Sequence, residues 1–239
     1  MKMKPLHKGN FGAWFLCGLM FLISLAAFPW LPEQVPIHFN AAGAVDGTGP
    51  RFMIFMFPGL TALLLLIAEI SPRIDPRQNN YRKFRRQYDR LHFVLALLFF
   101  LLDLYTIVIC FRPELTQTFS LGTWMPVFIG ALLAYCGNIM PKFKFNFFVG
   151  IKTPWTLADE NVWYLTHRFA GKVFVVCGVL MMPAAFLPPT RKVLLFFFLI
   201  LTIILLPSLY SYLVFRRRQE TGGADGTEKE SDENTREEP

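Results

Sequence analysis

Charged residues are scarce in this sequence: Asp, Glu, Lys and Arg make up 17% of the 239 residues, against about a quarter in typical soluble domains. Hydrophobic residues make up 54%. They are gathered in blocks of about 20, which is the length that a helix needs to cross about 30 Å of hydrocarbon. This composition excludes an ordinary soluble domain and indicates an integral membrane protein.

Cysteine and histidine are also rare, with four of each. The cysteines lie far apart inside predicted helices and form no CxxC pair, so neither a disulfide framework nor a zinc site has the necessary spacing. No HExxH motif, nucleophile elbow or phosphate-binding glycine loop is present. His38 and His167 are predicted on opposite sides of the membrane and cannot share a site. We therefore expect no enzyme activity, no metal and no cofactor.

Six apolar blocks predict six transmembrane helices in an all-α, polytopic membrane helix bundle. Helix is expected because the bilayer core holds no water to satisfy backbone N–H and C=O groups. The first block is too long for a signal peptide and has no small-residue cleavage site, so we expect it to remain as an anchor. The blocks cover residues 11–31, 52–70, 91–111, 119–140, 169–187 and 193–215.

The distribution of Lys and Arg predicts the orientation. All but four of these 24 residues fall on one side of the six blocks; the exceptions are Arg51, Arg112, Arg191 and Lys192. By the positive-inside rule the basic side is cytoplasmic, so both termini are expected inside. The net charge of +7 then indicates orientation and contact with anionic lipid rather than direct nucleic-acid binding. Residues 219–239 are acidic, lack aromatics and are expected to be a disordered tail.

Two loops are longer and more unusual than a helix bundle needs. The first, residues 32–51, is predicted to be extracellular, and its glycines and prolines specify turns. His38 could bind a ligand or cation, or change its charge near neutral pH. The candidate ligand residues are Pro36, His38, Asn40 and Gly43. An equally weighted alternative is a turn-rich cap over the first two helices.

The second unusual loop, residues 137–172, is predicted to be cytoplasmic. Phenylalanines at 143, 145 and 147 alternate with polar residues, which predicts packed aromatics and polar groups turned to water. Thr156 and Asp159 fit a capping box that starts a short helix lying along the membrane interface. Its apolar stripe would be Val162, Leu165 and Phe169.

Two interpretations of this second loop stay open. Its tryptophans can be interfacial anchors and its Arg168 a positive-inside charge. Alternatively, the segment is a preorganised docking surface for a cytoplasmic partner.

The run from Gly137 to Lys172 resembles the signature of the SdpI family of bacterial membrane immunity proteins. The matching elements are Gly-Asn, Pro-Lys, Asn, Gly-Ile-Lys-Thr-Pro-Trp-Thr-Leu, Trp, Thr-His-Arg and Gly-Lys. Lys152 departs from the family's usual Arg, so the bidentate fork is lost there. The extracellular loop resembles a domain of unknown function that often precedes the signature.

This resemblance implies a multi-pass protein of the bacterial cytoplasmic membrane that protects its producer against a membrane-active peptide toxin. It also allows signalling, by holding a transcriptional repressor at the membrane. The partner-binding residues expected from the signature are Asn138, Pro141, Asn146, Gly150, Lys152, Thr153, Pro154, Trp155, Thr156, Trp163, His167 and Arg168.

We expect an N-terminal membrane region at 1–115, an SdpI-like region at 116–218 and the acidic tail at 219–239. The extracellular loop would engage the toxin, and the 137–172 segment would give the cytoplasmic output. A proton-coupled or small-solute transporter is the alternative, because Asp103 lies mid-helix, where a charge costs about 2.5 to 3.5 kcal/mol. Thr202 lies at a similar predicted depth and could accept or donate a hydrogen bond there. A structural, hydrogen-bonded Asp103 and a proton or ion pathway both stay open.

Overall fold

The computed structural model describes the backbone of residues 10–234 and the side chains of residues 10–220. Within this part of the chain, six helical segments are long and apolar enough to cross a membrane, which confirms the predicted all-α bundle. The segments are Phe11–Trp30, Arg51–Ile74, Gln78–Phe111, Leu121–Lys142, Glu160–Phe186 and Pro189–Glu220. The backbone N–H and C=O groups of these segments bond one another, as the bilayer core requires, except where Pro72, Pro126 and Pro207 lie inside a helix and supply no N–H.

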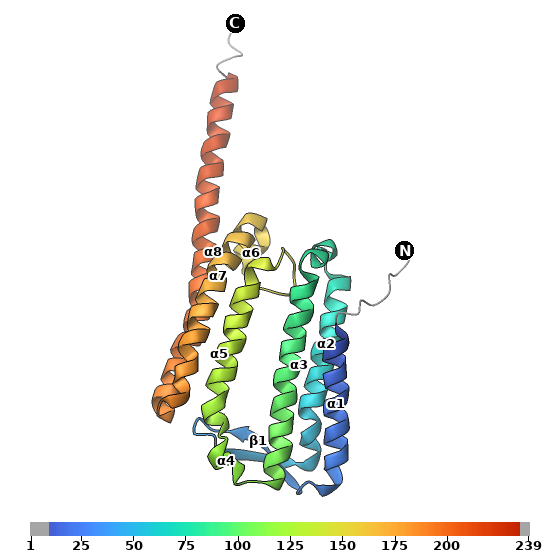
Figure 1. Cartoon of the computed structure of the whole chain (residues 1–239). Helices are drawn as coiled ribbons and strands as arrows, with labels where there is room; N and C mark the ends of the chain where they lie inside the picture. Colours follow the sequence, from blue (N-terminus) through green and yellow to red (C-terminus); the bar gives the residue numbers. More distant parts are fainter. Residues whose placement is uncertain (1–9, 235–239) are drawn as a thin grey trace, which may run out of the picture.

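The six helices form two groups of three (Figure 1). In the first group, α1 (Phe11–Ala27) and α2 (Met56–Ile74) pack against each other and against α3 (Tyr81–Phe111). In the second group, α7 (Glu160–Met181) packs between α5 (Leu121–Ile139) and α8 (Pro189–Asn234). The two groups meet along α3 and α5, and that contact is much less extensive than the contacts inside each group.

Four glycines set the close contact between α5 and α7. A Cβ atom on Gly130 would lie 2.5 Å from the carbonyl oxygen of Gly178, and one on Gly137 would lie 2.5 Å from that of Gly171. The glycines of each helix are seven residues apart, so they share one face. Small residues let membrane helices approach closely and gain van der Waals contact.

The loop at residues 32–50 folds into a two-stranded antiparallel hairpin, β1 (Gln34–Phe39) and β2 (Val45–Pro50). Its turn is fixed by Asn40, whose side chain accepts hydrogen bonds from the N–H groups of Ala42 (3.0 Å) and Ala44 (3.1 Å). The sequence predicts only turns here, because Pro36 and the glycines of β2 interrupt any strand pattern. The strand register is irregular around Pro36 and His38.

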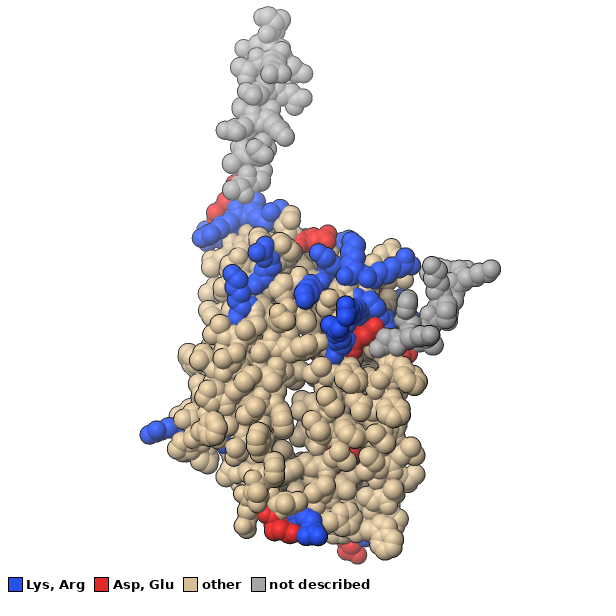
Figure 2. All heavy atoms as spheres, in the orientation of Figure 1, with Lys and Arg blue, Asp and Glu red and all other residues tan. Residues whose placement is uncertain are grey.

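The hairpin lies at one end of the bundle, which we call the hairpin end (Figure 1). The opposite end carries residues 141–160 and is called the motif end. Lys and Arg side chains gather at the motif end, and few lie at the hairpin end (Figure 2). This is the charge asymmetry expected from the sequence.

The expected disorder of residues 219–239 stays a prediction, because the side chains are described only as far as Glu220. The helical backbone continues past Glu220 to Asn234, while residues 235–239 lie outside the described residues. Arg216 and Glu220 add an i to i+4 ion pair at 3.0 Å near this point.

The short interfacial helix predicted after Thr156 is wrong. Instead, α6 (Pro154–Ala158) is a single turn, and α7 starts at Glu160 and continues directly into the fifth spanning segment. The three residues of the predicted apolar stripe differ in burial: Val162 is buried, Phe169 is half-buried and Leu165 is exposed. The buried face carries Val162, Trp163, Thr166 and His167, which pack toward the loop at the motif end.

Candidate functional site

The loop at the motif end, residues 143–153, is organised around one side chain, Asn146, which is 0% exposed. We call it the motif-end loop. Its Oδ1 accepts hydrogen bonds from the N–H groups of Phe148 (2.9 Å) and Val149 (2.7 Å). Its Nδ2 donates to the carbonyl oxygens of Lys144 and Val149, both at 2.9 Å. The prediction that Asn146 faces water is therefore wrong: the loop is not a strand, and it closes around the amide.

Trp163 and His167 form the floor of this loop. Their rings stack with centroids 4.0 Å apart, and the Trp163 indole N–H donates to the carbonyl oxygen of Phe143 at 3.0 Å. The N–H of Ile151 donates to His167 Nε2 at 3.0 Å, so the ring proton lies on Nδ1, which donates to the carbonyl oxygen of Trp163 at 2.8 Å. Both nitrogens of a neutral imidazole are thus used within the fold.

Gly150 is required by the same arrangement. Its φ is +123°, a conformation that L side chains rarely adopt, and a Cβ atom there would lie 2.3 Å from His167 Nε2. The sequence marks Gly150 only as part of a motif. Its contact with His167 supplies the physical reason for glycine.

The capping box of this segment lies three residues earlier than predicted. The Thr153 N–H donates to Thr156 Oγ1 (2.9 Å), and the Thr156 N–H donates to Thr153 Oγ1 (3.2 Å), with Pro154 at the first position of α6. The box predicted from Thr156 and Asp159 is wrong because the chain turns again at Asp159. Thr153 Oγ1 also lies 3.0 Å from Ser211 Oγ, which joins the loop to α8.

Asp159 caps α7. Its Oδ1 accepts from the N–H groups of Asn161 (2.7 Å) and Val162 (3.2 Å), and its Oδ2 accepts from Arg218 Nε at 2.9 Å. Partial burial would raise the pKa of Asp159, but the two N–H groups and the Arg218 guanidinium outweigh it and hold that pKa below its usual value. Asp159 thereby links the start of α7 to α8.

Sequence reasoning missed Asp75, which joins the two helix groups at the motif end. Its Oδ2 accepts from the Phe147 N–H (2.8 Å) and from the Tyr81 hydroxyl (2.9 Å). Asn80 Nδ2 donates to the carbonyl oxygen of Phe145 at 2.9 Å. An acidic residue among many basic ones was the only available signal, and it does not reveal a partner 72 residues away.

The predicted partner-binding residues divide by exposure. Asn146, Thr156, Trp163 and His167 are buried, whereas Asn138, Lys152, Pro154 and Arg168 are exposed. The others are half-buried: Pro141, Gly150, Thr153 and Trp155. Trp155 packs against Tyr212 of α8, with ring centroids 5.1 Å apart. A partner on this surface would therefore meet the exposed set, and the buried set shapes the loop beneath it.

At the hairpin end, the hairpin tip docks onto the start of α5. Ser120 Oγ donates to the carbonyl oxygen of Ala42 at 2.9 Å. Gly43 has φ +85°, and a Cβ atom there would lie 1.9 Å from Ser120 Oγ; one on Gly122 would lie 2.6 Å from the Gly43 nitrogen. The hairpin thus belongs to the first helix group and is seated on the second.

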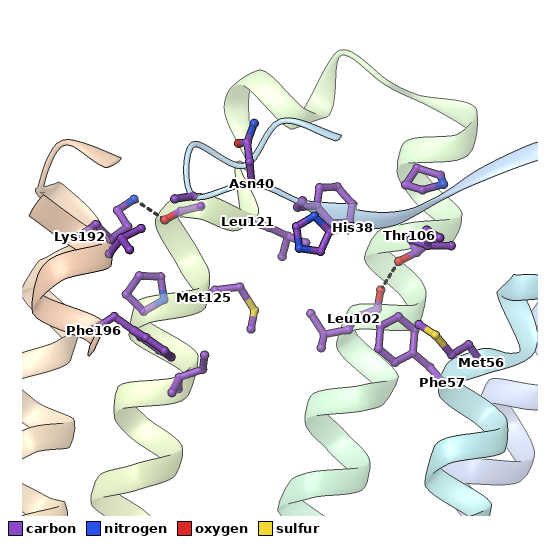
Figure 3. Close-up of a pocket in the computed structure, with 18 residues that line it drawn as sticks. His38, Asn40, Met56, Phe57, Leu102, Thr106, Leu121, Met125, Lys192 and Phe196 are labelled. Carbon is purple, nitrogen blue, oxygen red and sulfur yellow. Dashed lines mark hydrogen bonds between the residues drawn. The ribbon is translucent and has the colours of Figure 1, made fainter. Parts of the chain in front are cut away.

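A cavity of about 610 Å³ lies beneath the hairpin, between the two groups (Figure 3). Its roof includes three of the predicted ligand residues, Pro36, His38 and Asn40, whereas Gly43 serves the docking contact instead. His38 Nδ1 pairs with Asp46 Oδ1 at 2.5 Å on the exposed side of the hairpin. Within the described residues, no group of three or more His, Cys, Asp or Glu side chains could hold a metal ion.

Asp103 is fully buried in α3, and its hydrogen-bond partner lies in α1. Its Oδ2 accepts a hydrogen bond from Ser24 of α1 at 3.0 Å, and its Oδ1 has no partner among the described residues. Thr202 instead donates to the carbonyl oxygen of Phe198 in its own helix. Thr202, which the sequence offered as one possible partner, does not contact Asp103, because α1, and not α8, is the neighbour of α3.

Comparison with known proteins places these features in a family. Residues 142–211 match the SdpI/YfhL protein family, and residues 15–62 match the Domain of unknown function (DUF1648). The chain is 30% identical over 168 residues to "Immunity protein SdpI" of Bacillus subtilis (strain 168), covering 70% of this chain and 77% of that protein. No solved structure matches the chain.

Proposed function

The chain belongs to the SdpI/YfhL family of membrane immunity proteins, and from this membership we propose that it protects a bacterial membrane against a membrane-active peptide toxin. We place the motif end in the cytoplasm, following the distribution of Lys and Arg, and the hairpin end outside. Family membership points to a non-enzymatic, multi-pass membrane protein. The toxin would meet the hairpin from outside the cell.

One observation carries the proposal: the two helix groups are joined at both ends of the bundle and touch little between them. The Ser120–Ala42 bond joins them at the hairpin end, and the Asp75–Phe147 bond joins them at the motif end. A peptide bound on the hairpin would act on both groups, because the hairpin belongs to the first group and its tip is bonded to the second. Any change in their spacing would reach the motif-end loop through Asp75.

Survival of a toxin-sensitive bacterium that expresses the chain tests this function. His38 and Val45 are exposed on the two strands, so His38→Ala and Val45→Ala should each lower protection. A contact residue whose loss costs about 1.4 kcal/mol weakens binding about tenfold. Glu33→Ala, just outside β1, is the matched control. Full protection in both hairpin variants, at equal membrane abundance, would contradict a toxin contact there.

Signalling through a cytoplasmic transcriptional repressor is the finer part of the proposal. The exposed cations Lys152 and Arg168 flank the loop that Asn146 closes, so an acidic surface on the repressor would suit this end. Lys152→Glu and Arg168→Glu should release a fluorescently tagged repressor from the membrane, while Lys83→Glu, an exposed control at the same end, should not. If both variants still held the repressor at the membrane, the proposed binding of a repressor to the motif end would be contradicted.

A transport function has one observation in its favour, the buried Asp103 with an oxygen that lacks a partner among the described residues. A neutral carboxylic acid at this depth could pass a proton on. Proton flux into liposomes that contain the purified protein, lost in Asp103→Asn, would support transport. Protection that persists in Asp103→Asn would favour the immunity function.

A further inference from the structure

We propose that the cavity beneath the hairpin binds a membrane lipid with an anionic headgroup, which lies on Lys192 while one acyl chain occupies the space between α3 and α5. This binding site goes beyond the proposed function, because it would exist whether or not the chain protects against a toxin. Three observations carry it: a buried cation, apolar walls and the size of the space.

Lys192, near the start of α8, is the buried cation. It is 9% exposed, and its ammonium group donates to the carbonyl oxygen of Gly122 at the start of α5. None of the carboxylates in the described residues lies within ion-pair distance of it. An ammonium carries three N–H donors, so a single carbonyl leaves two of them for a ligand. A buried charge is costly unless it is paired, which favours an anion at this point.

The cavity walls have the opposite character. Below Lys192 the space is bounded by Phe196, Met125 and Leu102, which come from α8, α5 and α3 (Figure 3). His38 and Lys192 are the only side chains of the lining that can carry a charge, and neither can be negative. A ligand that suits this site is anionic at one end and hydrocarbon at the other.

The position of the site agrees with a lipid. Val193 and Phe196 lie at its edge and are 52% and 38% exposed, so the cavity opens sideways between the spanning helices. Lys192 sits where its helix begins, at the hairpin end, and Phe196 lies one turn further into the membrane. A headgroup at the membrane surface can therefore reach Lys192 while its chain points toward the bilayer centre.

The volume argues against a toxin helix as the occupant. One turn of an α-helix, 5.4 Å long and about 10 to 12 Å wide, fills about 420 to 610 Å³. A cavity of about 610 Å³ thus holds only about one to one and a half turns, whereas a spanning helix has about 20 residues. The same volume is ordinary for a small-molecule site, and each buried CH₂ group contributes about 0.8 kcal/mol.

The thermal midpoint Tm of the purified full chain, titrated with defined lipids in detergent, tests the proposal. Phosphatidylglycerol should raise Tm at lower concentration than phosphatidylcholine, and glycerol 3-phosphate without chains should have no effect. Lys192→Gln should weaken the apparent affinity for phosphatidylglycerol about tenfold, which is about 1.4 kcal/mol, and remove the preference. Lys192→Arg keeps the charge and should restore the preference, even if Lys192→Gln folds poorly.

One further variant tests where the acyl chain of the lipid lies, and a second is the control. Met125→Trp fills the cavity and should abolish the effect of phosphatidylglycerol without changing the midpoint measured in detergent alone. Arg191→Gln removes the adjacent exposed cation, which does not line the cavity, and should change nothing. The proposal would be overturned if the two lipids raised the Tm of the unaltered protein equally. It would also be overturned if Lys192→Gln kept the preference for phosphatidylglycerol. A Tm response to glycerol 3-phosphate alone, or to an apolar peptide in place of lipid, would also overturn it.

Discussion

Replacing Asn146 with Ala should open the motif-end loop. The substitution removes four hydrogen bonds to the loop backbone, from the N–H groups of Phe148 and Val149 and to the carbonyl oxygens of Lys144 and Val149. Each such bond contributes about 0.5 to 1.5 kcal/mol. The four together are worth about 2 to 6 kcal/mol, and the lower half of that range is expected because the loop can open to water.

The effect of Asn146→Ala should be local before it is global. We expect amide hydrogen exchange to rise about 30-fold or more over residues 143–153, since 2 kcal/mol corresponds to that factor at 1.4 kcal/mol per tenfold. Exchange in α1 and α2 should change little, because they lie in the other helix group. The Tm of the purified protein should also fall.

Two controls make this prediction specific. Lys144→Ala alters an exposed side chain of the same loop and should leave exchange unchanged. Asn146→Asp keeps the acceptor for the two N–H groups but loses both donors, so its exchange should lie between those of the unaltered chain and the alanine variant. Unchanged protection in Asn146→Ala would refute the reasoning that this amide holds the loop closed.

Four further predictions concern other contacts. Gly137→Val places a side chain where even a Cβ atom would lie 2.5 Å from the Gly171 carbonyl oxygen, so Tm should fall by several degrees. The control is Gly18→Val, at a helical glycine with open space around it, which should change Tm little. Gly150→Ala should lower the free energy of unfolding by about 1 to 3 kcal/mol, because the position has a positive φ and a Cβ atom there collides with His167. The Tm should fall and the Ile151 amide should lose its protection from hydrogen exchange. An unchanged Tm would contradict the contact. Asp75→Ala should loosen the junction of the two groups, detected as faster proteolysis of residues 143–153, while Asp46→Ala on the exposed hairpin should not. The pKa of Asp159 is lower in the folded protein than in an unfolded chain, so its contacts stabilise the α7–α8 junction at neutral pH. This stabilisation is lost as pH falls through the lowered pKa. Asp159→Asn should therefore flatten the acid side of a plot of Tm against pH.

The number of helices and the uneven distribution of charge followed from the sequence alone. Hydrocarbon thickness fixes how many apolar residues a spanning helix needs, so composition along the chain is enough to count the spans. The motif between Gly137 and Lys172 was found for a similar reason, because it is contiguous in the chain.

Which residues touch was decided only by the tertiary structure. Asn146 and His167 read as polar surface residues, yet both are buried, because the loop folds back over the start of α7. Ser24 and Asp103 are 79 residues apart, and Ala42 and Ser120 are 78 apart; neither pair leaves a trace in any local pattern. The cavity under the hairpin likewise exists only because two helix groups, joined at their ends, stand apart between them. Local periodicity reports the solvent that each helix meets, whereas contacts between distant segments depend on which helices become neighbours.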